Sequence, residues 1–428
     1  MSSNSESMKR LAIKLKSSFL KNTLLLVLSS LSRNIVLLLF WLAAAELYSQ
    51  QDVGIASSVL SSLFLIELVS RLGLDYSIIR FFPEKDKCKI FNTSIIIAPS
   101  LALLLGITCV GLQYFTDLAD AEPFNITSDL AFILLPFVLS AIVMLGTSFK
   151  AIHRPELSLF QNLLEILSIF LLLPVLSLGA EGIVWAYLIS LLVKLLISIA
   201  IAKRLGFRFF FGLDVDFFRD TFKFAIGNHL ANLSLSAIYL ILPIMVMFML
   251  GATKTAHFTI AFNICSLLFI IPTQIGESLF IEGSCTKGLK RLVFETVTIV
   301  TAILIILSTI LYFISPQLLE FAGREDLGGS YLYSLDLLRM LILSSFFVAF
   351  VSIYLAIKRI RKDTSELIVV SGLTTLMTII SCYVFMKYFG FMGVGYGWIA
   401  GYGFSFAIIG ILVFREIRSG NRYSLITN

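Results

Sequence analysis

Charged residues are scarce in this chain. Of its 428 positions, 14% are charged and 58% are hydrophobic, and the mean hydropathy is +0.95. A soluble domain could not cover that much apolar surface, and disordered chains have the opposite composition. The composition therefore predicts a polytopic membrane protein with an all-α fold.

The chain also has few of the residues that catalytic and metal sites need. It contains three histidines and five cysteines, with no Cys-x-x-Cys pair. No Ser/His/Asp set, Walker loop or nucleotide fingerprint is present, and short loops leave no room for a soluble catalytic domain. We expect no enzyme, metal site, cofactor or disulfide. The cysteines lie in apolar runs or in segments predicted inside: Cys88, Cys109, Cys265, Cys285 and Cys382.

Apolar windows of about 20 residues predict twelve transmembrane helices in two six-helix lobes. A basic leader (1–21) precedes the N-lobe (22–202), a linker (203–223) follows it, and the C-lobe (224–414) leads to a tail (415–428). The predicted spans are Asn22–Ala45, Val53–Ile79, Phe91–Phe115, Leu130–Phe149, Leu157–Leu178, Gly182–Ala202, Phe224–Leu250, Ala256–Ile281, Leu292–Ile314, Tyr331–Ile357, Leu367–Tyr388 and Val394–Phe414.

The distribution of positive charge predicts the orientation. Of the 33 Lys and Arg residues, only Lys254, Arg324 and Lys387 fall in the loops predicted outside. Most of the others flank the spans on the opposite side, so both termini are expected in the cytoplasm and the protein in the plasma membrane. Because this charge serves topology, the formal net charge of +6 does not predict nucleic-acid binding. The tryptophans lie near outer span ends, as in an interfacial aromatic belt, and Asn125 begins a glycosylation sequon in an outside loop.

Two short motifs predict an internal duplication. Gly179–Tyr187 and Gly390–Trp398 match in their glycines and aromatic residues, and each precedes the last span of its lobe. A basic loop precedes the fifth span of each lobe, with Lys150 in the first and Lys358 in the second. Six spans per unit would make the two repeats parallel, with a binding site between them.

The second predicted span carries three charges. Glu67, Arg71 and Asp75 follow at i, i+4 and i+8, so on a continuous helix they share one face. Each charge near the bilayer centre costs roughly 2.5–3.5 kcal/mol. Two interpretations remain open: a ladder that neutralises itself and holds helices together, or a polar stripe along a substrate path.

Further polar groups lie in other spans. Glu165 and Lys194 have matching depths in the fifth and sixth spans, which predicts an ion pair. Asp336 and Arg339 could pair in the same way. The first spans of the two lobes and the eighth span contribute Arg33, Asn228, His229, Asn232, Gln274 and Glu277. Either interhelical hydrogen bonding or a central cavity would account for them.

The region from Gln51 through Gly73 to Phe81 resembles the second-helix region of polysaccharide flippases, the O-antigen and exopolysaccharide transporters of the multidrug/oligosaccharidyl-lipid/polysaccharide superfamily. The Lys150–Pro155 loop and the repeated motifs Gly179–Tyr187 and Gly390–Trp398 resemble the ends of that family's two lobes. The likeness covers most of the chain, through loose motifs that the multidrug and toxin extrusion branch shares.

This resemblance implies a transporter that flips a lipid-linked oligosaccharide by alternating access. The cationic cavity residues would be Arg33 and Arg71, with Arg80 at the inner mouth, and a polyprenyl phosphate or diphosphate would need such charge. The second lobe departs from an all-cationic cavity. In the second lobe Asn228, Asn232 and Gln274 would contact substrate. The acids available for H⁺ or Na⁺ coupling are Glu67 and Asp75 in the first lobe and Glu277 in the second.

Two other classes of function remain alternatives. A drug or organic cation antiporter would use the acids for Na⁺ or H⁺ exchange, with Arg33 and Arg71 paired rather than free. A membrane glycosyltransferase, polymerase or ligase would need a large outside loop, which the chain lacks, although such enzymes would be partners of a flippase.

Overall fold

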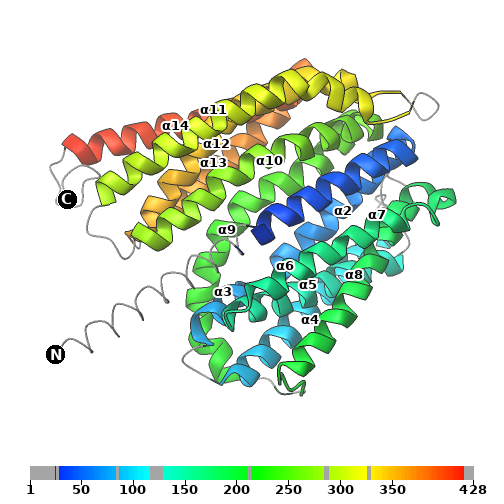
Figure 1. Ribbon diagram of the computed structural model, residues 1–428, viewed down its shortest axis with the longest axis vertical. Helices are drawn as coiled ribbons and strands as arrows, with labels where there is room; N and C mark the ends of the chain where they lie inside the picture. The colour runs from blue at the N-terminus through cyan, green and yellow to red at the C-terminus, as the bar shows by residue number, and fades with distance from the viewer. Residues whose placement is uncertain are drawn as a thin grey trace, which may run out of the picture.

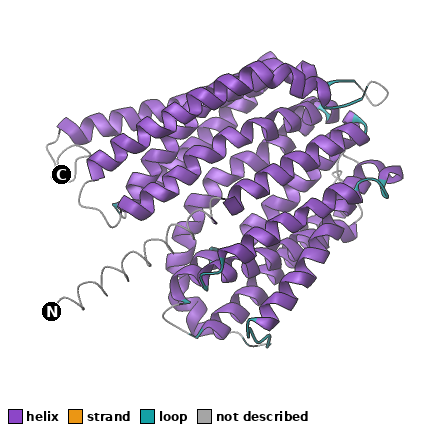
Figure 2. Ribbon diagram, in the orientation of Figure 1, coloured by secondary structure: helices purple, strands orange, loops and turns teal. Residues whose placement is uncertain are grey.

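The computed structural model describes residues 28–82, 86–115, 129–210, 214–283, 289–324, 329–361 and 363–418, with 25 and 212. The basic leader (1–21), the Asn125 sequon and the end of the tail (419–428) lie outside them. Within these ranges the chain forms helices and connecting loops, without strands (Figure 2). After a first helix, Leu28–Leu47, the elements are α2 (Gln50–Ser70), α3 (Leu74–Phe81), α4 (Lys87–Phe115), α5 (Asp129–Ala151), α6 (Pro155–Leu163), η3 (Leu164–Ile166), α7 (Leu167–Leu171), η4 (Leu176–Leu178), α8 (Gly179–Arg204), α9 (Val215–Leu250), α10 (Ala252–Gly283), α11 (Leu289–Phe321), η6 (Tyr331–Ser334), α12 (Leu335–Ile360), α13 (Thr364–Phe389) and α14 (Met392–Arg418).

The predicted all-α membrane fold is confirmed. Among the described residues, 11 helices are long and apolar enough to cross a membrane. The remaining predicted span, Leu157–Leu178, is present as the short segments α6, η3, α7 and η4. None of these pieces is long enough to span by itself. The twelve predicted spans therefore correspond to eleven long helices and one interrupted helix.

The helices form two lobes that lie side by side (Figure 1). The first helix and α2–α8 make up one lobe, and α9–α14 make up the other. Helix α9 packs against α13 of its own lobe and also against α2 and α3 of the first lobe, while α10 packs against α2. The lobes are therefore in contact through α2 and α3 of the first lobe and α9 and α10 of the second, which belong to spans predicted to carry polar residues.

The repeated glycines have the same backbone conformation in both lobes. Gly179 has φ 55° and ψ −132°, and Gly390 has φ 57° and ψ −134°. Both residues lie in the positive-φ region that favours glycine, at the turn before the last helix of their lobe. The motif repeat found in the sequence is thus a repeat of structure as well.

The second span is not the continuous helix that the sequence predicts. Helix α2 ends at Ser70, and the chain turns through Leu72 (φ 49°) and Gly73 (φ 77°) before α3 begins. A Cβ at Gly73 would lie 2.2 Å from the carbonyl oxygen of Ala225 in α9, so only glycine fits this close approach. The expected alignment of three charges on one helix face is therefore wrong for Asp75, which belongs to α3.

The seventh span begins earlier than predicted. Helix α9 starts at Val215, capped by Asp214, whose side chain accepts a hydrogen bond from the backbone N–H of Phe217. The segment before it is held on the N-lobe, because the Asn92 amide donates to the carbonyl oxygen of Arg208 over 2.7 Å. Part of the predicted linker (203–223) is thus the first two turns of α9.

Candidate functional site

A cavity of about 670 Å³ lies between the lobes, near the helix ends that the charge count assigns to the cytoplasm. Its walls are formed by residues of the first helix, α3, α5, α6, η3, α8, α9 and α10, together with Arg71 at the end of α2. Six of the predicted site residues line it: Arg33, Arg71, Asp75, Asn232, Gln274 and Glu277. The structure thus brings together polar groups from both lobes that lie up to 244 positions apart in the sequence.

Arg33 and Lys150 are the cations of this cavity with no partner among the described residues. Both side chains are exposed, so water reaches them through the cavity. The charges of Arg33 and of Glu277 act on Lys150, which places the three groups in one electrostatic environment. Two cations without ion pairs, beside a single carboxylate from the other lobe, can bind an anion.

Arg71 has a partner within its own helix. Its Nε donates to Glu67 Oε1 and its Nη2 donates to Glu67 Oε2, each over 2.6 Å. The side chain of Glu67 is 2% exposed and that of Arg71 is 16% exposed. This bidentate pair uses two of the five guanidinium N–H groups, so the remaining donors of Arg71 are available to the cavity. Glu67 and Arg71 thus neutralise each other within one helix, and this pair does not join two helices.

Asp75 lines the same cavity from α3, and its Oδ1 atom is buried without a hydrogen-bond partner. A buried carboxylate oxygen of this kind is costly unless a ligand, an ion or a proton satisfies it. Glu277 lines the opposite lobe with an exposed side chain, on which the charges of Lys150 and Arg359 act. The two acids thus approach the cavity from different lobes.

Three predicted site residues do not line the cavity. Glu67 is buried behind Arg71, Arg80 lies over the ring of Phe81 at 5.8 Å from its centroid, and Asn228 is half-buried in α9. The break after Ser70 explains the position of Arg80, because it turns α3 away from the direction of α2.

The predicted ion pair between Glu165 and Lys194 is confirmed, and both residues lie in the cavity wall. Lys194 Nζ donates to Glu165 Oε1 over 2.5 Å, and the side chains are 3% and 5% exposed. Glu165 lies in η3, the 3₁₀ segment that interrupts the fifth span. Short 3₁₀ segments inside a helix often mark a hinge or a strained site. For Asp336 and Arg339 the sequence left open a pair or a place at the outer mouth, and the structure has them paired at 3.9 Å.

Lys150 is one of the cavity residues that sequence reasoning did not assign to the site. It was expected in a basic loop, but it lies in the last turn of α5 and faces the cavity. Its counterpart in the second repeat, Lys358, is buried and donates to Glu366 over 2.8 Å. Near Lys150 the corresponding acid, Glu156, pairs instead with Arg154 at 3.1 Å. The repeat comparison is the sequence signal that could have singled out Lys150.

The lobes are in contact at the other end of the bundle. A Cβ at Gly54 would lie 1.8 Å from the carbonyl oxygen of Ala252, so α2 and α10 cross there with their backbones touching. Thr259 Oγ1 donates to Ser57 Oγ over 2.8 Å, and Gln50 Nε2 donates to a backbone carbonyl at 329 over 3.1 Å. The charged cavity is therefore closed off from the end of the bundle that is predicted to face outward.

The described residues contain no group of three or more His, Cys, Asp or Glu side chains that could hold a metal ion.

Two of the three tryptophans are placed differently from the expected interfacial belt, because Trp41 and Trp398 are 4% and 0% exposed between helices. The expectation of a lipid-facing belt is wrong for these two residues.

Comparison with known proteins agrees with this architecture. A MATE transporter in complex with MaL6 has 17% identity and a TM-score of 0.65, over 94% of this chain and 96% of that one. A MOP superfamily transporter from Pyrococcus furiosus has 18% identity and a TM-score of 0.65, with the same coverage. An inward-facing MATE family transporter has 18% identity and a TM-score of 0.62, over 92% and 94%.

A search of curated proteins finds no match. The sequence model of one family, described as polysaccharide biosynthesis protein, matches residues 19–280, which is more than half of the chain. That stretch contains the whole first lobe and the first two helices of the second, and so every residue named above in the charged cavity. The chain belongs to the polysaccharide biosynthesis protein family and has the fold of the MOP superfamily transporters.

Proposed function

We propose that this protein is a plasma-membrane flippase that moves a lipid-linked oligosaccharide from the cytoplasmic to the outer leaflet by alternating access. The observation that carries the proposal is a pair of cations, Arg33 and Lys150, that lie in a cavity between the lobes and have no partner in the part of the chain that the structure describes. A polyprenyl phosphate or diphosphate is the anionic group of such a substrate. Cations in a cleft of low dielectric constant would hold it strongly.

Arg71 would supply further donors to the same phosphate. Because Glu67 holds two of its N–H groups, the guanidinium is oriented before the substrate arrives, which lowers the entropy lost on binding. Asn232 and Gln274 from the second lobe line the cavity opposite these cations. Their amides are suited to sugar hydroxyl groups, while the prenyl chain would remain in the lipid.

The contact between the lobes at Gly54 and Ala252 supports the alternating-access part of the proposal. The structure has the form expected of a state loaded from the cytoplasm, with a charged cavity at one end and touching helices at the other. Release to the outside would require α2 and α10 to separate at that contact.

The test is transport of a fluorescent prenyl diphosphate-linked sugar in proteoliposomes. We expect Arg33→Ala with Lys150→Ala to weaken substrate affinity at least tenfold, since each charge-assisted hydrogen bond contributes roughly 1.5–3 kcal/mol. The matched control is Lys203→Ala with Arg204→Ala, two exposed cations at the end of α8 that do not line the cavity. Equal transport by the wild-type chain and the cavity variant would refute the proposal.

A second candidate function, ion-coupled export of an organic cation, is favoured by one observation. Asp75 and Glu277 present carboxylates to the cavity, neither has an ion-pair partner among the described residues, and Asp75 Oδ1 is buried. In that case Asp75→Asn and Glu277→Gln should abolish proton- or sodium-driven cation uptake into inverted vesicles. The Arg33→Ala, Lys150→Ala variant should retain it. The proposed flippase predicts no such uptake by the wild-type chain.

A further inference from the structure

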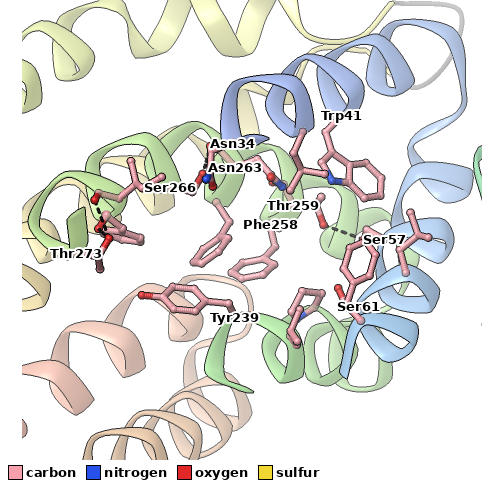
Figure 3. A pocket seen from close by; sticks show the side chains of 18 residues that line it. Asn34, Trp41, Ser57, Ser61, Tyr239, Phe258, Thr259, Asn263, Ser266 and Thr273 are labelled. Atoms are coloured by element: carbon pink, nitrogen blue, oxygen red, sulfur yellow. Dashed lines mark hydrogen bonds between the residues drawn. The ribbon is translucent and has the colours of Figure 1, made fainter. Parts of the chain in front are cut away.

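A second cavity of about 290 Å³ lies beside the charged one (Figure 3 shows its lining residues). It lies between the first helix, α2, α9 and α10, and it shares Asn34 and Ile270 with the charged cavity. Ser57 and Thr259, whose hydroxyl groups are hydrogen-bonded across the lobe interface, belong to its lining. The second cavity therefore lies between the charged cavity and the contact between the lobes.

The second cavity differs in chemistry from the first. None of its 18 lining residues is charged. Six are aromatic and seven are uncharged residues with hydroxyl or amide groups. The aromatic residues are Trp41, Phe64, Tyr239, Phe258, Phe262 and Phe269. This combination of flat apolar walls with a few hydrogen-bonding groups is typical of a small-molecule site.

Two amides are held ready by their own helices. Asn34 Nδ2 donates to the carbonyl oxygen of Ser30 over 2.9 Å, and Asn263 Nδ2 donates to the carbonyl oxygen of Thr259 over 2.8 Å. The Oδ1 atom of each amide has no hydrogen-bond partner in the described chain, and both side chains face the cavity together with the rings of Trp41 and other aromatic residues (Figure 3). Each amide can therefore accept a hydrogen bond from a ligand without losing the bond that orients it.

The aromatic wall is fixed from behind by Trp398. Its ring is stacked on Phe269 at 5.7 Å with an interplanar angle of 13°, and it contacts Phe262 at 5.5 Å and Tyr239 at 5.8 Å. Trp398 has no exposed surface, so these rings are packed on the side away from the cavity. A wall whose rotamers are already fixed loses little conformational entropy when a ligand binds.

We propose that the second cavity binds one uncharged pyranose ring of the lipid-linked head group while the phosphate lies at Arg33 and Lys150. This rests on the proposed function and specifies the class of sugar. A pyranose has an apolar C–H face that stacks on aromatic rings and a rim of hydroxyl groups that donates to Asn34 and Asn263. An acidic sugar would bury its carboxylate among uncharged groups, which is unfavourable. A prenyl chain would cover both amides without satisfying them.

The experiment measures binding of three probes to the purified full-length chain in nanodiscs. The probes are a prenyl diphosphate without sugar, the same lipid with one glucose, and the same lipid with one glucuronic acid. We expect the glucose probe to bind about tenfold more tightly than the sugar-free probe, as two net hydrogen bonds would give. The glucuronic acid probe should gain nothing. This comparison uses the wild-type chain and so does not depend on a variant that must fold.

The variant Asn263→Leu, at a residue outside the charged cavity, should reduce the gain from glucose to about threefold, as loss of one of two net hydrogen bonds would give, and leave sugar-free binding unchanged. The control, Thr309→Val, changes an exposed α11 side chain that bonds only its own helix, and it should retain the gain. Equal binding of the glucose and sugar-free probes would overturn this inference and leave the proposed function standing. Tighter binding of the sugar-free probe by Asn263→Leu, which makes the cavity more apolar, would assign the cavity to the prenyl chain and also overturn it. Failure of all three probes to bind would refute the proposed function itself.

Discussion

The ion pair between Glu165 and Lys194 allows a quantitative prediction about folding. Both side chains are at most 5% exposed, and the donor and acceptor atoms are 2.5 Å apart. Two unit charges about 4 Å apart attract by roughly 4 kcal/mol at an effective dielectric constant near 20. Removing one partner of a buried pair costs about 3–5 kcal/mol, because the other charge stays buried without compensation. Lys194→Met alone and Glu165→Gln alone should each destabilise the protein by about this amount.

The double variant Glu165→Gln, Lys194→Met should be much milder than the sum of the single changes. With both charges absent, no buried charge is left uncompensated, so the double variant should cost less than either single change, and the coupling energy of the cycle should be at least about 3–5 kcal/mol. The assay is thermal unfolding in detergent micelles, read as loss of the monodisperse peak, together with yield from the membrane. Additive effects of the two single changes would refute this reasoning.

The matched control is an ion pair of similar length outside the core. Arg291 Nε and Glu295 Oε1 are 2.6 Å apart on α11, but the Arg291 side chain is 88% exposed. Water and salt screen such a pair, so Arg291→Met and Glu295→Gln should leave the unfolding temperature unchanged. A large loss of stability here would show that burial is not what distinguishes the two pairs.

Two further predictions follow from contacts at the lobe interface. Arg71→Ala should lower membrane yield, because Glu67 would stay buried without its partner at a cost of about 3–5 kcal/mol. The double variant Glu67→Gln, Arg71→Met should restore the yield. Normal yield of Arg71→Ala would contradict a structural pair. Gly54→Ala places a methyl group 1.8 Å from the Ala252 carbonyl oxygen, so we expect the lobes to separate at that end. A cysteine introduced at position 57 should then react more with a thiol reagent that does not cross the membrane. Gly111→Ala, where a Cβ has no atom within 4 Å, should not change the labelling.

The membrane spans and their repeat could be predicted from sequence because each depends on local properties. A run of about 20 apolar residues has one stable solution in lipid, a helix, since every backbone group must be hydrogen-bonded internally. The repeated glycines at 179 and 390 could be recognised because a turn with positive φ requires glycine wherever it recurs. The interruption of the fifth span has a sequence signal only at its second break, where Pro174 lies in the turn between α7 and η4. The change to a 3₁₀ helix at η3 has no Pro or Gly nearby to mark it.

The members of the charged cavity were predictable in part. Arg33, Arg71 and Gln274 stood out because charged and amide side chains are rare in apolar spans, and they do line one cavity. Asn228 has the same composition signal, but it does not line the cavity, since residue type does not specify which way a helix face turns. Lys150 had no such signal, because lysine is ordinary at the cytoplasmic end of a span.

The sequence by itself therefore determined the number of spans, the duplication, the scarcity of charge and the pairing of Glu67 with Arg71. That pairing needs no tertiary structure, because residues i and i+4 are neighbours on one helix. Tertiary structure decided which of these groups remain available. The approach of α9 to Gly73 breaks the second span and places Asp75 on a separate helix. Partners on neighbouring helices neutralise Lys194 and Lys358, whereas Lys150 has no ion-pair partner among the residues that the structure describes. The physical reason is that pairing between helices depends on their separation and rotation, which packing of the whole bundle sets.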